Sequence, residues 1–191
     1  MTDMSAGEQK IVRYLSAAHA EERKLEAVLA EHAAATPRKA YKDRLQKHIK
    51  ETRDHAKALE KRIGQLGGNP DSLVDRAPEP VSDAVGAAQG AVRKAASMAQ
   101  DGMNTLRRTG DQEKLLANAR AEYASEAHEI ATYTAIEALA DALGDTDTSK
   151  LARGIRRDEE RMQKFLSDLI PKLVRAAVQE EIAPPRAAAS A

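Results

Sequence analysis

The sequence predicts an all-α protein, folded as an antiparallel four-helix bundle. Only 3% of its 191 residues are aromatic, whereas a β-sandwich or barrel would need more aromatic and β-branched side chains. Apolar residues recur every three or four positions in four long segments, which is the spacing of one face of an α-helix. Two junctions between these segments are short, so the segments that they join are expected to lie antiparallel.

The first two helices are expected to form one hairpin. The first covers residues 6–33, because Ser5 and Glu8 have the spacing of a capping box. In the break "ATPRK", Thr36 can act as a cap and Pro37 suits the first position of the second helix. The run "GGNP" ends the second helix.

The last two helices are expected to form a second hairpin. The third runs from Asp111 to Leu143, where Gly144 provides a C-terminal signal. The fourth follows "GDTDTS", and Pro171 should bend or loosen its last turns.

A long crossover is expected between the hairpins, over residues 67–110. A Pro-rich linker, "PDSLVDRAPEP", opens this segment, and an Ala-rich helix is expected over residues 82–108. Two antiparallel hairpins joined by one long crossover have the ferritin-like topology. We therefore expect a single ferritin-like domain over residues 1–180 and a disordered tail over residues 181–191.

Composition narrows the classes of function. The formal net charge is zero, which argues against general nucleic-acid binding. The absence of cysteine excludes disulfides and thiol chemistry. No signal-peptide core is present and no run approaches 18 apolar residues, so we expect a cytoplasmic protein with no membrane partner.

Every long helix carries a glutamate on or beside its apolar face. Glu is almost never fully buried without a partner, because an unpaired buried carboxylate is costly. Several such residues therefore need a common explanation. The glutamates are Glu22, Glu51, Glu126, Glu129 and Glu159, of which Glu51 lies on the flank of its face.

These carboxylates are expected at one depth in the bundle. The position midway between Glu22 and Glu51 is the first interhelical turn, and Gly144 lies midway between Glu129 and Glu159. In antiparallel hairpins, residues equidistant from a turn lie level with each other. Carboxylates from all four helices at the middle of a bundle are typical of dinuclear metal sites.

Two histidines on the second helix share the apolar face. His48 lies three residues before Glu51, and His55 four after it, so either ring could join a metal site. We expect Glu22 and Glu51 to bind one ion with His48 or His55. Glu129 and Glu159 would bind the other, with Glu126 bridging or next to it.

Other readings of these residues remain open. A single core histidine is more often a packing residue than a ligand, and Glu126 and Glu129 could pair with Arg156 or Arg157 across the hairpin. Met162 stands where the fourth helix would supply a histidine, and a thioether is a poor ligand for iron or manganese. The second ion could therefore be held by carboxylates alone, bind weakly or be absent.

Several stretches resemble the YciE/YciF-type ferritin-like stress proteins. The most specific are the "HxxET" block at His48–Thr52 and the "ExxEIxxY" run from Glu126 to Tyr133. The resemblance implies a four-helix bundle, often dimeric, with a di-iron or related centre and an association with stress responses. It places the family's acidic positions on the five glutamates and its histidine on His48. Ala127 replaces a histidine found in some relatives, so occupancy by metal can be partial.

Two classes of function follow from these features. The first is a stress-related protein that binds two iron (or manganese) ions per chain, and either reduces peroxide or O2 or oxidises Fe(II). The alternative is a metal-free helical bundle that acts as an interaction scaffold. The resemblance also implies that the protein is a homodimer.

Overall fold

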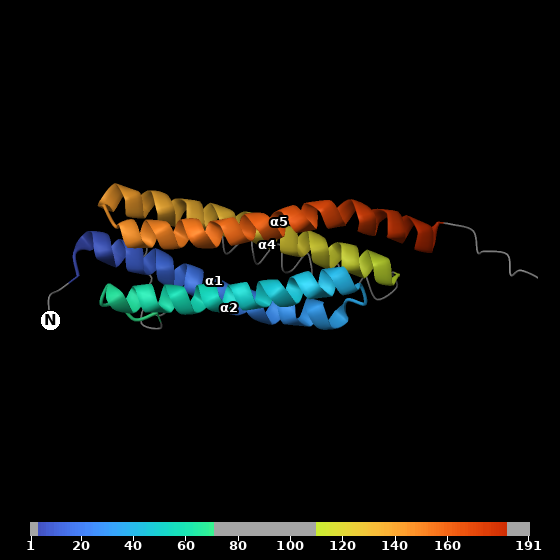
Figure 1. Cartoon of the computed structure of the whole chain (residues 1–191), viewed down its shortest axis with the longest axis horizontal. Coiled ribbons are helices and arrows are strands. Elements are labelled where there is room, and N and C mark those ends of the chain that lie inside the picture. Colours follow the sequence, from blue (N-terminus) through green and yellow to red (C-terminus); the bar gives the residue numbers. More distant parts are fainter. Residues whose placement is uncertain (1–3, 71–109, 183–191) are drawn as a thin grey trace, which may run out of the picture.

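The computed structural model describes residues 4–70 and 110–182, which form four α-helices (Figure 1). These are α1 (Ala6–Ala35), α2 (Lys39–Gln65), α4 (Asp111–Leu143) and α5 (Thr146–Glu181). The expected all-α, four-helix architecture is confirmed. The helix expected over residues 82–108 and the tail from residue 183 onward lie outside the described residues.

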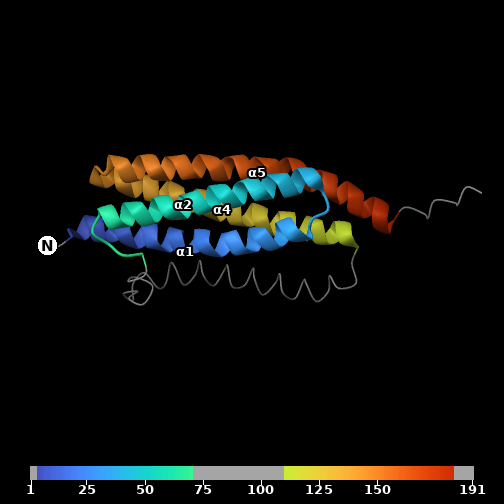
Figure 2. The ribbon, with the colours of Figure 1, turned by 60° about the horizontal axis from the view of Figure 1, so that its bottom comes forward.

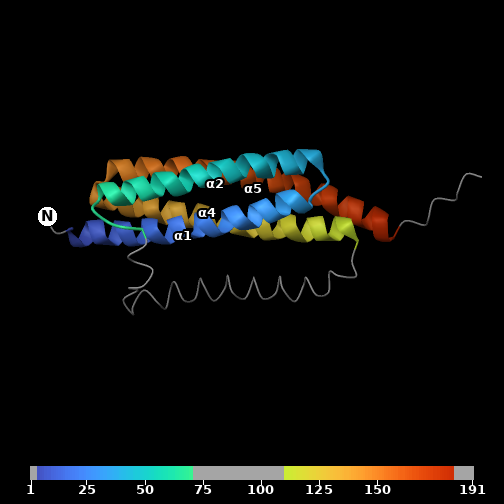
Figure 3. The same cartoon turned by 90° about the horizontal axis from the view of Figure 1, so that it is seen from below.

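The helices pair as two antiparallel hairpins that pack side by side. Helix α1 packs on α2, and α4 packs on α5, while α1 also contacts α4 and α2 contacts α5. Helix α2 ends at one end of the bundle and α4 begins at the other, as Figures 2 and 3 show. The end of the first hairpin and the start of the second therefore lie at opposite ends of the bundle.

Helix α1 starts where the sequence predicts, whereas the turn between α1 and α2 lies elsewhere than expected. The Ser5 backbone N–H donates to Glu8 Oε2 at 2.7 Å and the Glu8 backbone N–H donates to Ser5 Oγ at 3.2 Å, which completes the capping box. Pro37 was expected in the first turn of the second helix, but α2 begins only at Lys39. Helix α1 likewise continues two residues beyond the expected end, to Ala35, so the turn is shifted by two residues, and Thr36 Oγ1 in it accepts the backbone N–H of Arg38 at 3.3 Å.

Helix α5 begins earlier than expected, at Thr146 and not after "GDTDTS". Asp145 is its N-cap and accepts the backbone N–H of Thr148 at 3.0 Å. The Arg62 guanidinium near the end of α2 donates to the same carboxylate at 2.6 Å. This residue therefore starts α5 and ties the two hairpins together at one end of the bundle.

Pro171 lies inside α5 and does not end it. The helix continues to Glu181, and its last turns are bent relative to the rest of the helix in Figure 2. A proline removes one backbone hydrogen bond and clashes with the preceding turn, which is the usual cause of such a bend.

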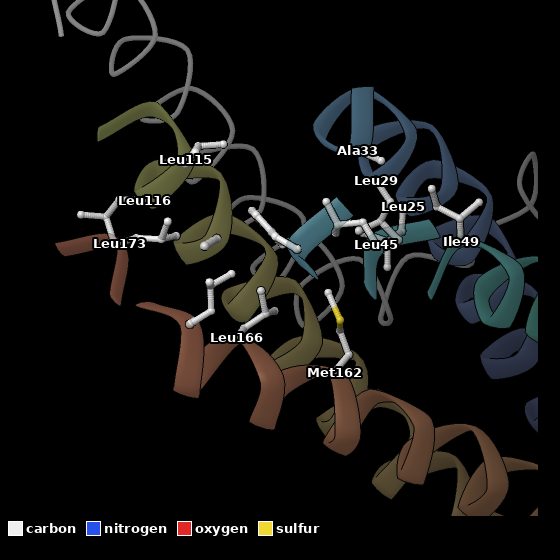
Figure 4. Packing of buried hydrophobic residues seen from close by; sticks show 13 residues of the cluster. Leu25, Leu29, Ala33, Leu45, Ile49, Leu115, Leu116, Met162, Leu166 and Leu173 are labelled. Atoms are coloured by element: carbon white, nitrogen blue, oxygen red, sulfur yellow. The ribbon is translucent and has the colours of Figure 1, made fainter. Parts of the chain in front are cut away.

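Apolar side chains fill two separate parts of the interior. Figure 4 shows the cluster near the α1–α2 turn, where Leu166 and Met162 of α5 face residues of the other helices. The second cluster lies near the α4–α5 turn and includes Leu15, Leu59 and Tyr133. Every helix passes from one cluster to the other through a stretch of buried polar residues. None of the described helices is both long enough and apolar enough to cross a membrane.

The Asp145 cap is testable by paired substitutions. Replacing Asp145 by Ala should lower the free energy of unfolding by about 1–2 kcal/mol, because the cap and the Arg62 contact are both lost. The Asn variant keeps the cap and should lose less than half of this. Contacts with Arg62 and Thr148 outweigh burial and lower the pKa of Asp145. The advantage of Asp over Asn should therefore vanish as the pH falls through this lowered pKa.

Urea denaturation at about pH 7 and about pH 3 measures both effects. Asp168→Asn is the matched control, because Asp168 is an exposed aspartate inside the same helix that pairs with Lys164 and not with Arg62. Equal losses for Asp145→Ala and Asp145→Asn at neutral pH would contradict the capping role.

Candidate metal centre

A layer of buried polar side chains separates the two apolar clusters. It contains glutamates from α1, α4 and α5 and both histidines of α2, all at most 6% exposed. Its members are Glu22, His48, His55, Glu126, Glu129 and Glu159. Of the glutamates expected at one depth, Glu22, Glu126 and Glu159 are brought together with the histidines.

His48 faces two of these carboxylates. Its Nε2 lies 3.2 Å from Glu126 Oε1 and 3.3 Å from Glu159 Oε2. The three ligand atoms lie within 4.8 Å of one another, which is close enough for all of them to bind one ion.

His55 faces a second pair of carboxylates. Its Nδ1 lies 3.0 Å from Glu159 Oε1 and 3.4 Å from Glu22 Oε1. Glu159 therefore directs one oxygen to each histidine. The two histidines were expected to compete for one role, but each belongs to its own group of potential ligands, and the groups share Glu159.

Many polar atoms of this layer lack a hydrogen bond, although they are buried. Among the described residues they include His48 Nε2, His55 Nδ1, and both carboxylate oxygens of Glu126 and Glu159. One carboxylate oxygen of Glu22 and one of Glu129 are also buried without a hydrogen bond. Buried polar atoms are nearly always paired in native proteins, so unpaired atoms of this kind that converge fit a bound ion.

Burial and mutual repulsion disturb the protonation of the carboxylates. Burial raises the pKa of Glu22 and Glu159, and neighbouring carboxylates raise them further. Burial raises the pKa of Glu129 well above its usual value, and Glu159 and Glu22 add to this effect. The charges of both groups thus act on Glu129, which belongs to neither.

The pKa values of the two histidines are also raised, but by the neighbouring carboxylates and not by burial. Burial lowers the pKa of each ring, but the adjacent carboxylates outweigh it. The pKa of His48 rises to about 9 through Glu126 and Glu51, and that of His55 rises to about 9 through Glu159 and Glu22. Without metal, positively charged histidines therefore compensate part of the buried negative charge.

Glu51, expected among the ligands, is not brought together with the other carboxylates. Its Oε2 lies 3.2 Å from His48 Nδ1, the ring nitrogen that does not face Glu126. Arg44 Nη1 donates to the same oxygen at 2.9 Å, and Lys47 Nζ lies 3.4 Å from the other. Although burial raises the pKa of Glu51, His48 and Arg44 outweigh it and lower the pKa to about 2.

Two polar contacts of the layer were missed in the sequence. The Tyr133 hydroxyl donates to Glu22 Oε1 at 2.5 Å, and His55 Nε2 lies 3.1 Å from Asp158 Oδ2. Tyr133 follows Glu129 by one turn, so its spacing was a usable signal. Asp158 directly precedes Glu159, and adjacent helical residues point in different directions, so no spacing rule associates it with the layer.

The alternative that Glu126 and Glu129 of α4 pair with Arg156 across the hairpin is wrong. Arg156 pairs with Glu137 and Glu160, and not with Glu126 or Glu129. A separate network holds the buried carboxylate of Glu122. This carboxylate accepts a hydrogen bond from the Tyr41 hydroxyl at 2.7 Å, and its other oxygen is hydrogen-bonded to His32 Nδ1 at 2.6 Å.

Comparison with known proteins assigns the family. The protein family described as "Domain of unknown function (DUF892)" matches residues 8–179. The chain belongs to this family. No match was found among curated proteins.

Solved structures share the fold of this DUF892 member. A protein from Xanthomonas campestris pv. campestris is 19% identical, with a TM-score of 0.68 over 93% of this chain and 99% of that chain. The Escherichia coli stress protein YciF is 21% identical, with a TM-score of 0.65 over 90% and 99% of the two chains. The resemblance to YciF-type proteins is thereby confirmed.

A third structure relates the fold to the ferritins. It is described as a dodecameric thioferritin, the bacterioferritin-related protein from Bacteroides fragilis. It is 19% identical to this chain, with a TM-score of 0.60 over 93% of this chain and 92% of that chain. At these identities the likeness shows the fold, which is ferritin-like.

The pKa shifts predict how stability depends on pH in the metal-free protein. The raised pKa values of Glu22, Glu129 and Glu159 make folding less favourable as the pH rises above the ordinary range of Glu. The contribution of His48 and His55 is fully present below their ordinary pKa and is lost as the pH rises through about 9. Both effects have the same sign, so the free energy of unfolding should fall from about pH 5 to about pH 9.

Denaturation in the presence of a chelator measures this trend. Glu129→Gln removes one buried charge and should make the metal-free protein more stable than wild type at about pH 8, by on the order of 1 kcal/mol. Glu31→Gln, an exposed change on α1, is the control. A metal-free protein that becomes more stable with rising pH would contradict the assignment.

Proposed function

We propose that the chain binds two divalent ions of iron or manganese in the polar layer and uses them in a reaction with peroxide or O2, or in Fe(II) oxidation. The observation that carries this proposal is the set of buried ligand atoms without hydrogen bonds, which come from all four helices. A purely structural layer would be expected to give each of these carboxylate oxygens a hydrogen-bond donor. The two ring nitrogens reach only some of them, at 3.0–3.3 Å.

The charge of the layer supports two ions. Glu22, Glu126, Glu129 and Glu159 supply four negative charges when ionised, and all four are buried. Two divalent cations would balance this charge with both histidines neutral, as metal ligands must be. Without them, the layer holds four carboxylates against at most two imidazolium ions.

The types of ligand suit iron or manganese. Carboxylate oxygens and imidazole nitrogens are ligands for these metals, whereas thiolate or thioether ligands would favour softer ions. Met162 stands where α5 would supply a histidine, and its side chain is fully buried in the apolar cluster of Figure 4. The histidine contributions come instead from α2.

Each residue of the layer would have a defined role. His48 with Glu126 would hold one ion, His55 with Glu22 would hold the other, and Glu159 would bridge them. Glu129 would complete the charge balance next to both positions. Two such ions, when bound, would supply the electrons that reduce small oxidants. Because the surrounding side chains are buried, they would exclude all but small substrates such as peroxide or O2.

The comparisons agree with this proposal at the level of fold. A solved relative is described as a stress protein and another as a thioferritin, and both descriptions belong to those proteins. By analogy we propose a stress-related role in the cytoplasm, as a homodimer.

A metal-free scaffold is the second candidate function. Its support is an exposed apolar stripe on the last turns of α5, formed by Val174, Val178 and Ile182. Exposed apolar residues one turn apart are suited to contact with a partner. The stripe lies away from the polar layer, so the two functions depend on different residues.

Metal content tests the main proposal. The protein is purified without chelator, loaded with Fe(II) or Mn(II) in the absence of oxygen, desalted and subjected to elemental analysis. We expect two ions per chain in wild type, about one in Glu22→Ala, and fewer than one in Glu159→Ala, because Glu159 is shared. Glu31→Ala is the control on α1 and should retain both ions. Clearly substoichiometric metal in wild type after loading would sink the proposal.

Stability with and without metal separates the two candidates. Loading should raise the free energy of unfolding of wild type by about 2.7 kcal/mol per site when free metal is 100-fold above Kd. This gain should be largely absent in Glu159→Leu, which replaces the shared carboxylate with an apolar side chain. If Glu159→Leu lowers the free energy of unfolding by the same amount with and without metal, the result would favour the scaffold.

A further inference from the structure

Both histidines of the layer have the same arrangement of contacts. Each ring directs one nitrogen toward the inner carboxylates and the other nitrogen toward an outer carboxylate. For His48 the outer contact is Nδ1 to Glu51 Oε2, at 3.2 Å. For His55 it is Nε2 to Asp158 Oδ2, at 3.1 Å. The two rings thus use opposite nitrogens to achieve the same pattern.

Each outer carboxylate is itself held by an arginine. Arg44 donates to the Glu51 oxygen that contacts His48, at 2.9 Å. Arg161 forms an ion pair with the other oxygen of Asp158. The sequence spacing hides this similarity, because Glu51 follows its histidine on α2, whereas Asp158 reaches His55 from α5.

This pattern has a known physical consequence. A neutral imidazole that donates N–H from one nitrogen offers the lone pair of the other, so in the metal-binding form of the ring the outer carboxylate fixes the tautomer. It also fixes the plane of the ring and makes the inner nitrogen a better donor to a metal. Such outer contacts typically change metal affinity by about 10–100-fold.

We propose that Glu51 and Asp158 are positioning residues, each of which tunes one ion position through one histidine. Glu51 acts through His48 on the position shared with Glu126, and Asp158 acts through His55 on the position shared with Glu22. This inference rests on the proposed metal binding. It replaces the expectation that Glu51 is itself a ligand, because Glu51 contacts the nitrogen of His48 that faces away from Glu126 and Glu159.

The two positions are not equivalent. The side chains of Arg44 and Glu51 are 13% and 15% exposed, whereas those of Arg161 and Asp158 are 58% and 24% exposed. Water screens the second pair more strongly, so it holds its histidine less firmly. In addition, Glu22 Oε1 already accepts the Tyr133 hydroxyl, while neither oxygen of Glu126 has a hydrogen bond. The His48 position should therefore bind its ion more tightly.

Calorimetric titration of the metal-free full chain with Mn(II) tests the proposal, with electron paramagnetic resonance to count free Mn(II). The variants are Glu51→Gln and Asp158→Asn, which preserve shape and remove charge. Each should still bind two ions, with the tighter site weakened about 10–100-fold in Glu51→Gln and the weaker site in Asp158→Asn. Asp54→Asn and Asp168→Asn are matched controls, because both residues are exposed carboxylates on the same two helices.

A double-mutant cycle excludes a merely structural effect. In a His48→Ala background, Glu51→Gln should no longer change Mn(II) affinity, whereas Asp158→Asn should retain its effect. Loss of one whole ion in Glu51→Gln would show that Glu51 is a ligand, and unchanged affinity in both variants would show that neither residue positions a ring. Either result overturns the inference while wild type still binds Mn(II). Failure of wild type to bind any Mn(II) would instead refute the proposed function, and the inference with it.

Discussion

Burial of four glutamates at one level of the bundle is the constraint on which the other features of this chain depend. Carboxylates in an apolar interior are costly, and two histidines can offset only part of their charge. The chain compensates with an apolar cluster on each side of the layer, one near each end of the bundle. Long helices are needed for this arrangement, because each must cross both clusters and the polar layer between them.

The depth of the layer is set by the two interhelical turns. Sliding one helix by a single residue would rotate its side chains by about 100°, and would turn a glutamate out of the layer. The turns therefore help to position the residues of the layer, although they lie far from it. The contact of Asp145 with Arg62 holds the register between hairpins, since it joins the start of α5 to the end of α2.

Much of this structure could be predicted from the sequence, because helix periodicity and distance from a turn are properties of the backbone. These determine which glutamates and histidines share a depth, and Glu22, Glu126, Glu129 and Glu159 were found in this way. Helix starts were less accurate, since the contacts of Thr36 and Asp145 decide them. The direction of a side chain within the layer could not be predicted. Glu51 lies on the flank of its helix, and the partner of Asp158 is on another helix, so only three-dimensional packing shows which ring each one contacts.

The most direct test of this account is anomalous diffraction from crystals of the full chain grown with Mn(II). The account predicts two peaks about 3.5–4 Å apart, one next to His48 and Glu126 and the other next to His55 and Glu22. Both peaks should lie within bonding distance of Glu159. Mn(II) bound only at the surface, with the buried carboxylates paired to each other or to ordered water, would contradict the account.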